Sequence, residues 1–196
     1  MRRFKVLIPL FIVVIIYLFF SGYRITPLSA ANAFPLLPKD AELVEEMKIS
    51  TTPIFVYKSE EENQYVSVTS EKNGVFYRST QSTFVPIRTD SLQTVGLMNF
   101  RNKDGEGTYF SVLSTDEEVF YIEVGIDPDV IRKEIRAGES VSFYLSSFEV
   151  INFLYPTAYN KDGKPLFYYG IPKNAPTYTP EDIKWHEIIE AEKLDE

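Results

Sequence analysis

An unbroken apolar segment near the start of the chain is the feature that most constrains its fold. Val6 to Tyr23 is a run of eighteen residues without a charge. In a bilayer the backbone polar groups of such a segment must bond within the segment, which a helix achieves. The length also matches the ~30 Å hydrocarbon core of a membrane. The sequence therefore predicts that residues 1–24 form a short cytoplasmic stub and a transmembrane anchor.

The charges that flank this segment predict its orientation. Arg2, Arg3 and Lys5 precede it, and Arg24 alone follows. Because cytoplasmic flanks carry the excess of Lys and Arg, the N-terminus is expected in the cytoplasm and the rest of the chain outside. That remainder of roughly 160 residues has the size of an ordinary domain. The predicted localisation is a single-pass cell-membrane protein with an extracytoplasmic domain.

A cleaved signal peptide is the alternative interpretation. Ala31-Asn32-Ala33 has the small-x-small form of a cleavage site, and cleavage near Ala33 would give a secreted product. The apolar stretch from Val6 to Phe20 is, however, at the upper limit for a signal peptide. The candidate site also lies far beyond Phe20. These two observations favour a retained anchor.

The net charge of the exported part limits its partners. The chain has 20 Lys and Arg against 28 Asp and Glu. Four of the basic residues and none of the acidic ones precede Phe34, which leaves 16 against 28, a formal charge of −12. Such a surface repels phosphate backbones, so we expect no nucleic-acid partner.

Residues that carry catalysis or bind metals are scarce. The chain has no cysteine, which excludes disulfides, thiolate metal sites and cysteine nucleophiles. His186 is the single histidine, so a Ser-His-Asp arrangement would have to be built around it near the C-terminus. We predict no catalytic, cofactor-binding or metal residues and no cofactor. Whether the protein is an enzyme stays open, and a non-enzymatic role is favoured.

The segment after the anchor changes character twice. Residues 25–39 contain Pro27, Pro35 and Pro38 and are expected to form a juxtamembrane spacer. Lys39 to Lys48 then places Leu43, Val44 and Met47 at helical spacing behind Asp40 as a cap. This pattern predicts a short amphipathic helix.

Beyond Pro53 the apolar period changes to two, which predicts strands. The expected strands cover 54–57, 64–69, 75–78, 92–100, 108–113, 119–124, 141–145, 150–154 and 166–169. The first two should pair as a hairpin across the acidic stretch 59–63. Short strands with frequent turns predict a mainly β fold, an antiparallel β-sandwich or curved sheet with short flanking helices, over residues 40–178.

The tetrapeptide Asn-Lys-Asp-Gly occurs at 102–105 and again at 160–163. Neither copy has the alternating oxygen ligands and distant Glu that a calcium loop requires. Asn suits the start of a type I turn and Gly its left-handed end. Both copies are therefore predicted to be hairpin turns.

Two segments near the end of the chain carry mixed signals. Residues 129–136 fit either a helix begun by Asp127-Pro128 or a charged edge strand, and the strand is slightly favoured. Residues 179–196 are predicted to form a C-terminal helix and an acidic tail. The helix would start at Thr179-Pro180 and cover Ile183 to Glu190.

Aromatic residues crowd the last third of the domain and provide the candidate functional surface. Exposed tyrosines among apolar neighbours can bind a partner protein or a sugar ring. Alternation places Phe167 and Tyr169 on one face of their strand. The candidate partner or glycan surface consists of Tyr155, Tyr159, Phe167 and Tyr169.

The order of anchor, acidic segment, aromatic strands and closing hairpin resembles uncharacterised small single-pass membrane-anchored proteins of Bacillus-like bacteria. The resemblance rests on Leu37 to Lys58, Phe110 to Val124, and Thr157 to Lys164 continuing into Leu166 to Tyr169. It implies an exported β domain with a regulatory or accessory role, and it assigns no functional residue.

Two functions fit these observations. The first is a non-enzymatic binding, sensing or accessory domain, tethered to the membrane and engaging another protein of the cell envelope. The alternative is a cell-wall or carbohydrate-active module with an acid pair beside aromatic residues, which requires two carboxyl groups about 5–10 Å apart. The absence of catalytic motifs favours the first.

Overall fold

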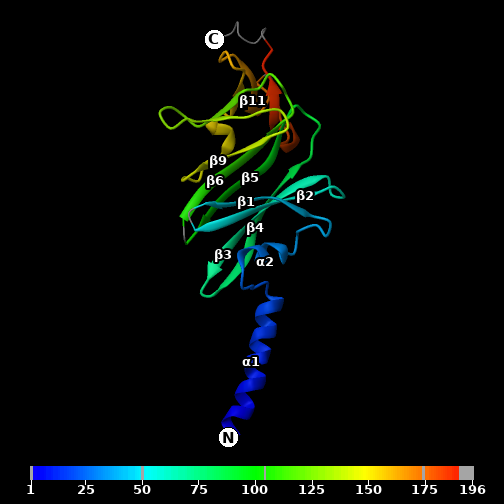
Figure 1. The fold of residues 1–196 in the computed structure, drawn as a ribbon, viewed down its shortest axis with the longest axis vertical. Coiled ribbons are helices and arrows are strands. Elements are labelled where there is room, and N and C mark those ends of the chain that lie inside the picture. Colours follow the sequence, from blue (N-terminus) through cyan, green and yellow to red (C-terminus); the bar gives the residue numbers. More distant parts are fainter. Residues whose placement is uncertain (1, 50, 104, 174, 190–196) are drawn as a thin grey trace. The chain divides into compact units, whose positions relative to one another are not determined.

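A computed structural model describes the chain except for residues 1, 50, 104, 174 and 190–196, and it leaves the side chains of residues 2–8 undescribed. The helices are α1 (Arg2–Phe20), α2 (Pro27–Asn32) and the 3-10 turns η1 (Ile151–Leu154) and η2 (Pro180–Asp182). The strands are β1 (Glu42–Ile49), β2 (Thr52–Ser59), β3 (Gln64–Asn73), β4 (Phe76–Pro86), β5 (Leu92–Asn102), β6 (Gly105–Ser114), β7 (Tyr121–Val124), β8 (Ile131–Glu134), β9 (Ser140–Leu145), β10 (Thr157–Tyr159), β11 (Pro165–Gly170) and β12 (Lys184–Glu187). The fold is therefore mainly β, as the sequence predicts (Figure 1).

The strands form three sheets. Their orders are β1-β2-β3-β4, β5-β6-β9 and β12-β11-β10-β7-β8, and the pairs with a defined register are antiparallel. Contacts within the chain divide it into two compact units, where the sequence predicts one domain. The first unit comprises residues 1–83 and 102–105, and the second comprises 84–101 and 106–196.

The first unit is built on the sheet β1-β2-β3-β4. The hairpin of β2 and β3 is confirmed, with Ile54 opposite Thr69 and Ser59 opposite Gln64. Ala31 of α2 packs against the buried side chains of Phe55, Tyr57, Val66 and Val68. The segment 25–39, predicted to be a spacer, thus contributes to the core of this unit.

A hydrogen bond fixes α2 to the sheet. Tyr57 Oη donates to Asn32 Oδ1 at 2.6 Å, and burial, assisted by Glu46, raises the pKa of Tyr57 to about 12. The phenol therefore stays protonated and remains a donor at neutral pH. Thr26 caps α2 through a bond from the Ser29 amide at 3.2 Å, and the Ser29 hydroxyl oxygen accepts one from the Thr26 amide.

The prediction of a helix over residues 39–48 is wrong, because most of this segment belongs to the edge strand β1. Met47 and Ile49 point toward the core in alternation, and β1 pairs with β2 from Glu42 to Ile49. A helix of this length is marginal by itself, whereas pairing satisfies its backbone groups on a neighbouring strand. Asp40 does not cap a helix. It accepts hydrogen bonds from the Ser59 hydroxyl at 2.8 Å and from the Glu61 amide at 3.0 Å. The hydrogen bond from the Glu61 amide lowers the pKa of Asp40.

The core of the second unit combines residues of both remaining sheets. Its buried members are Leu92, Phe110, Val112, Val119, Ile122, Val124, Ile135, Phe143, Ile151, Leu154, Ala158, Tyr169 and Trp185. Phe110 lies at the centre, with its ring 5.1 Å from that of Tyr169 and 6.2 Å from that of Trp185. The aromatic residues thus supply the burial that a chain without disulfides needs.

Two further predictions in the second unit are wrong. Residues 150–154 are not a strand but contain η1, in which Ile151 and Leu154 are buried at the three-residue spacing of a 3-10 turn. The C-terminal helix is replaced by η2 and the strand β12. Thr179 and Asp182 do form a capping box, but β12 then pairs with β11 and buries Trp185 opposite Tyr169. Residues 190–196 of the predicted tail lie outside the described residues.

Other local predictions are confirmed. The ambiguous segment 129–136 contains the strand β8, paired with β7. In the second Asn-Lys-Asp-Gly copy, Asn160 Oδ1 accepts bonds from the amides of Asp162 and Lys164, and Gly163 has φ +80°. That copy is the turn between β10 and β11. In the first copy, Asp104 lies outside the described residues.

Within the part of the chain that the structure describes, no helix is both long enough and apolar enough to cross a membrane.

Candidate functional site

The four aromatic residues predicted to form a functional surface have different environments. Tyr155 is 66% exposed, Tyr159 and Phe167 are half-buried, and Tyr169 is only 7% exposed. Phe167 packs against the core cluster of the second unit, and Tyr169 belongs to it. The four residues therefore do not make one exposed platform.

Tyr159 is engaged by its own neighbours. Its ring stacks on that of Tyr121 with centroids 4.9 Å apart, and the Arg132 guanidinium lies 4.2 Å from the Tyr121 ring centroid. Arg132 also forms an ion pair with Glu123 at 2.6 Å. The pKa of Tyr159 is raised mainly by burial and secondly by the Glu123 carboxylate. These contacts connect the side chains of β7, β8 and β10. They also cover one face of the Tyr159 ring, which a ligand would otherwise contact.

Tyr155 belongs to an exposed apolar segment around η1. Phe148, Val150, Phe153 and Tyr155 are each more than 40% exposed, while Ile151 and Leu154 anchor the turn in the core. Tyr155 ends η1 in the left-handed region, with φ +46°. A large side chain rarely adopts this conformation, so the surrounding contacts must impose it.

Tyr169 lines a cleft of about 350 Å³ in the second unit. This volume lies within the range of small-ligand sites. The cleft is lined by Phe84, Val85, Pro86, Arg88, Asp90, Leu92, Thr94, Leu97, Tyr169, Pro180, Glu181, Ile183, Lys184 and Trp185. Apolar side chains dominate this lining, and a few polar groups converge on it, as in typical binding sites.

Trp185, one of the lining residues, also carries a buried donor without a partner in the described part of the chain. The side chain is 5% exposed, and its Nε1–H has no hydrogen-bond partner among the described residues. Leaving a buried N–H unpaired costs about 1–3 kcal/mol, and such groups in native structures require an explanation. A bound group with an acceptor oxygen would satisfy it.

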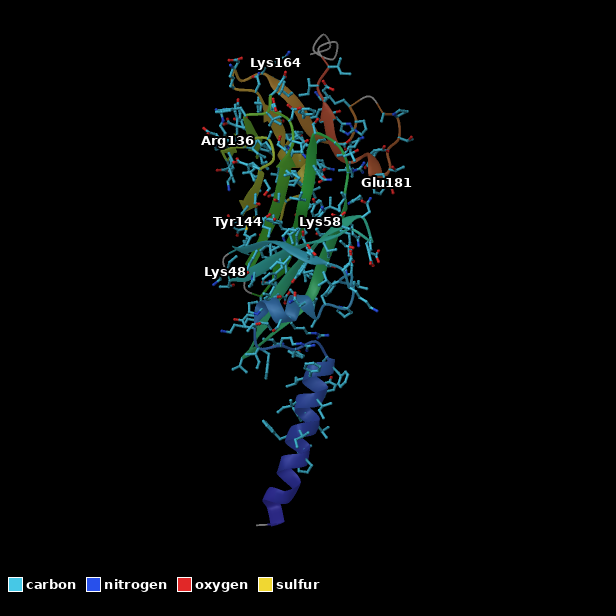
Figure 2. All side chains as sticks on the ribbon, turned by 45° about the vertical axis from the view of Figure 1, so that its right-hand side comes forward. Lys48, Lys58, Arg136, Tyr144, Lys164 and Glu181 are labelled. Atoms are coloured by element: carbon cyan, nitrogen blue, oxygen red, sulfur yellow. The ribbon has the colours of Figure 1, made fainter. Side chains whose placement is uncertain are left out.

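Charged residues form the rim of the cleft. Arg88 Nη2 donates to the Glu181 carbonyl oxygen at 2.6 Å and so ties the β4–β5 connection to η2, on which Glu181 is labelled in Figure 2. Two cations, Arg88 and Lys184, face two acids, Asp90 and Glu181, so the rim is close to neutral. This balance contrasts with the acidic surface of the chain and suits an uncharged ligand.

Two pKa shifts describe the polar side of the cleft. Burial raises the pKa of Tyr169, against the opposing effects of the Thr94 hydroxyl and of Arg88. The Thr179 hydroxyl lowers the pKa of Glu181. At neutral pH the cleft therefore holds a protonated phenol inside and an ionised carboxylate at its edge.

His186 has a structural role. Its ring stacks on Tyr168 with centroids 5.2 Å apart, and Nε2 lies 3.1 Å from the Gly170 carbonyl oxygen and 3.0 Å from that of Asp182. Because both partners only accept, Nε2 carries the proton and donates to them. These bonds connect β12 to β11 and η2, and they position Trp185 next to His186.

No family model, curated protein or solved structure matches this chain.

The cleft is not predicted by the sequence, although the sequence contains one signal for it. Ile183 and Trp185 alternate at a period of two, which indicates a strand, but their position after Thr179-Pro180 favoured a helix. The remaining walls come from β4, β5 and their connection, residues far from Trp185 in the sequence. Among the described residues, no group of three or more His, Asp or Glu side chains is placed to hold a metal ion.

Proposed function

We propose that this protein is a non-enzymatic binding module, held by α1 at the outer face of the cytoplasmic membrane, and that the cleft beside Trp185 is its ligand site. Both sheets of the second unit contribute to one core, which supports a β-sandwich behind the site. The ligand is an apolar side chain followed by a hydrogen-bond acceptor, presented by another protein of the cell envelope.

The amino-acid composition of α1 supports anchoring. The charge-free run from Val6 continues through the helix, and much of its described apolar surface is exposed. Leu10, Phe11, Ile12, Val13, Val14, Ile15, Ile16, Phe19 and Phe20 are each at least 45% exposed. Apolar area of this kind is stable when lipid covers it. The cations before Val6 support an extracytoplasmic domain.

The environment of the candidate cleavage site supports retention of the anchor. Ala30 and Ala31 are 1% and 0% exposed, and Asn32 accepts the hydrogen bond from Tyr57. Proteases cut exposed, locally unfolded segments most readily. Cleavage after Ala33 would remove α2 from the core of the first unit.

The unpartnered indole N–H of Trp185 is the observation that carries the binding proposal. A buried donor without a partner is costly, and a ligand whose acceptor reaches the Trp185 Nε1–H would remove that cost. An apolar side chain next to a backbone carbonyl, as any peptide provides, fits both properties of the cleft.

The pKa shifts favour binding over hydrolysis. Glycoside hydrolysis needs one carboxyl group with a raised pKa, so that it can donate a proton at neutral pH. At the cleft, the pKa of Glu181 is lowered by the Thr179 hydroxyl, and that of neighbouring Asp182 is lowered by the Thr179 amide. Both groups are therefore less often protonated at neutral pH than free carboxyls, and so less able to donate a proton there.

Photo-crosslinking in cells tests the proposal with a matched pair of positions. Phe84 lines the cleft, Phe120 does not, and each is 44% exposed. A photoreactive phenylalanine analogue at position 84 of the full chain is expected to capture one envelope protein, while the same analogue at 120 captures none above background. Crosslinked peptides from the partner should contain an apolar side chain at the point of attachment.

A second substitution links capture to the indole donor. Trp185→Phe keeps an aromatic ring but removes Nε1–H, so capture from position 84 is expected to fall by roughly tenfold, the value of one lost hydrogen bond. Equal capture from positions 84 and 120, or capture that is unchanged by Trp185→Phe, would contradict the proposed site.

A further inference from the structure

The end of α1 is joined directly to strand β4. The backbones of Arg24 and Tyr77 bond in both directions, at 2.9 Å and 2.7 Å. Arg24 Nη1 also donates to the carbonyl oxygens of Phe19 at 2.7 Å and Tyr23 at 2.8 Å, and its guanidinium lies 4.0 Å from the Phe19 ring centroid. The turn between β3 and β4 is therefore held close to the C-terminal end of α1.

A cleft with basic walls adjoins this junction within the first unit. It measures about 210 Å³ and is lined by Tyr23, Glu71, Lys72, Asn73, Arg78, Thr80 and Lys103. Three cations face one carboxylate, in a chain whose net charge is −8. None of the three cations forms an ion pair within the described part of the chain.

The cations have defined positions relative to Tyr23. The Arg78 guanidinium lies 5.4 Å from the Tyr23 ring centroid, and Asn73 Nδ2 donates to Tyr23 Oη at 3.4 Å. The Tyr23 ring also meets that of Phe76 edge to face, with centroids 6.4 Å apart. Tyrosine among apolar and basic side chains is typical of residues at a membrane interface.

The tip of the same turn presents an apolar side chain. Val75 is 77% exposed, and Gly74 beside it has φ +63°, which lets the turn project. An exposed valine alone is ordinary. Here it lies between the cations Lys72 and Arg78 in the sequence, two residues before Tyr77, which pairs with Arg24 after the end of α1.

We propose that this basic cleft binds the phosphate of anionic lipid headgroups in the membrane that holds α1, while Val75 inserts among the lipid chains. This inference rests on the proposed anchoring by α1. Lys72, Arg78 and Lys103 supply the positive charge, and the Asn73 amide and Thr80 hydroxyl can donate hydrogen bonds to phosphate oxygens. The contact would hold the first unit against the membrane surface despite the acidic charge of the chain.

A single-cysteine label tests this inference, because the chain has no cysteine of its own. Val75→Cys carries an environment-sensitive fluorophore in the full chain, reconstituted into vesicles of phosphatidylcholine alone or with about one third phosphatidylglycerol. Glu61→Cys, at the exposed β2–β3 turn of the same unit, is the control position.

The expected result is emission at shorter wavelength from the label at 75 in phosphatidylglycerol vesicles, and no change at 61. The shift should disappear at high salt and in a variant that combines Lys72→Gln, Arg78→Gln and Lys103→Gln. Inorganic phosphate at millimolar concentration should leave the shift in place, because the lipid headgroups are concentrated at the surface.

Three results would overturn the inference. Equal emission in both kinds of vesicle would show that headgroup charge is not recognised, and loss of the shift with inorganic phosphate would assign the cleft to a free anion. The protein could float with both kinds of vesicle while the label at 75 keeps the emission wavelength that it has in water. That result would refute the contact but leave the anchor intact. Protein that does not float with the vesicles would refute the anchor itself.

Discussion

Replacing Phe110 by alanine is expected to destabilise the second unit by about 3–5 kcal/mol, the range for deleting a large buried aromatic side chain. Phe110 is completely buried, and its ring contacts those of Phe143, Tyr169 and Trp185. Alanine would leave a cavity among large rings that cannot all move into it. Because small domains are stable by only about 5–15 kcal/mol, this is a large part of the total.

Because the chain has a single tryptophan, the loss of stability can be measured for the second unit separately. Trp185 belongs to the second unit, so its fluorescence during denaturant unfolding of the full chain in detergent reports that unit alone. Phe120→Ala is the control, because Phe120 is 44% exposed and its loss should cost less than about 1 kcal/mol. Similar midpoints for the two variants would contradict the assignment of Phe110 to the centre of the core.

Gly125→Ala is expected to lower the free energy of unfolding by about 3 kcal/mol. Part of this loss comes from the positive φ at this position and part from a steric overlap. Gly125 has φ +127°, and its amide donates to the Leu154 carbonyl oxygen at 2.8 Å. A Cβ at this position would overlap the Asp129 carbonyl oxygen and lie 3.1 Å from the Val130 Cα. The obstacle is backbone, so no side-chain rotation relieves it.

Gly138→Ala separates the two contributions to this cost. Gly138 also has positive φ, +83°, but a Cβ at this position would have no atom within 4 Å, so its substitution should cost only about 1 kcal/mol. Unfolding of both variants is followed by Trp185 fluorescence, as for Phe110→Ala. Equal losses at 125 and 138 would mean that the turn between β7 and β8 can shift to admit a side chain.

The sequence was most informative where a period of two extended over several residues. The hairpin of β2 and β3 follows from the apolar run at 54–57, the alternation at 64–69 and the acidic turn between them. The turn at 160–163 follows from the specific roles of Asn160 and Gly163. In both cases local chemistry and tertiary pairing favour the same structure.

Predictions failed where helical spacing and strand pairing competed within a few residues. Leu43, Val44 and Met47 fit one helix face, yet the segment forms β1 because β2 offers backbone partners from Glu42 to Ile49, with one register shift between Leu43 and Glu45. The capping box at Thr179 produces only one 3-10 turn before Trp185 pairs with β11. Such outcomes depend on a neighbouring strand edge, which the local sequence does not reveal.

The candidate site was the least predictable part. Tyr169 was placed on an exposed surface because alternation gives two faces but not which of them is covered. The cleft arises where the connection after β4 meets η2 and β12, and the contact of Arg88 with Glu181 joins residues 93 positions apart.

Location outside the cytoplasm, with the anchor retained, is the premise of the proposed function, and one labelling measurement tests it. Lys161→Cys puts a single thiol on the exposed β10–β11 turn of a chain that has no other. A membrane-impermeant maleimide applied to intact cells is expected to label this thiol in the membrane fraction, in a product that keeps all 196 residues. Labelling that appears only after the cells are broken, or a labelled product that has lost residues 1–33, would contradict it.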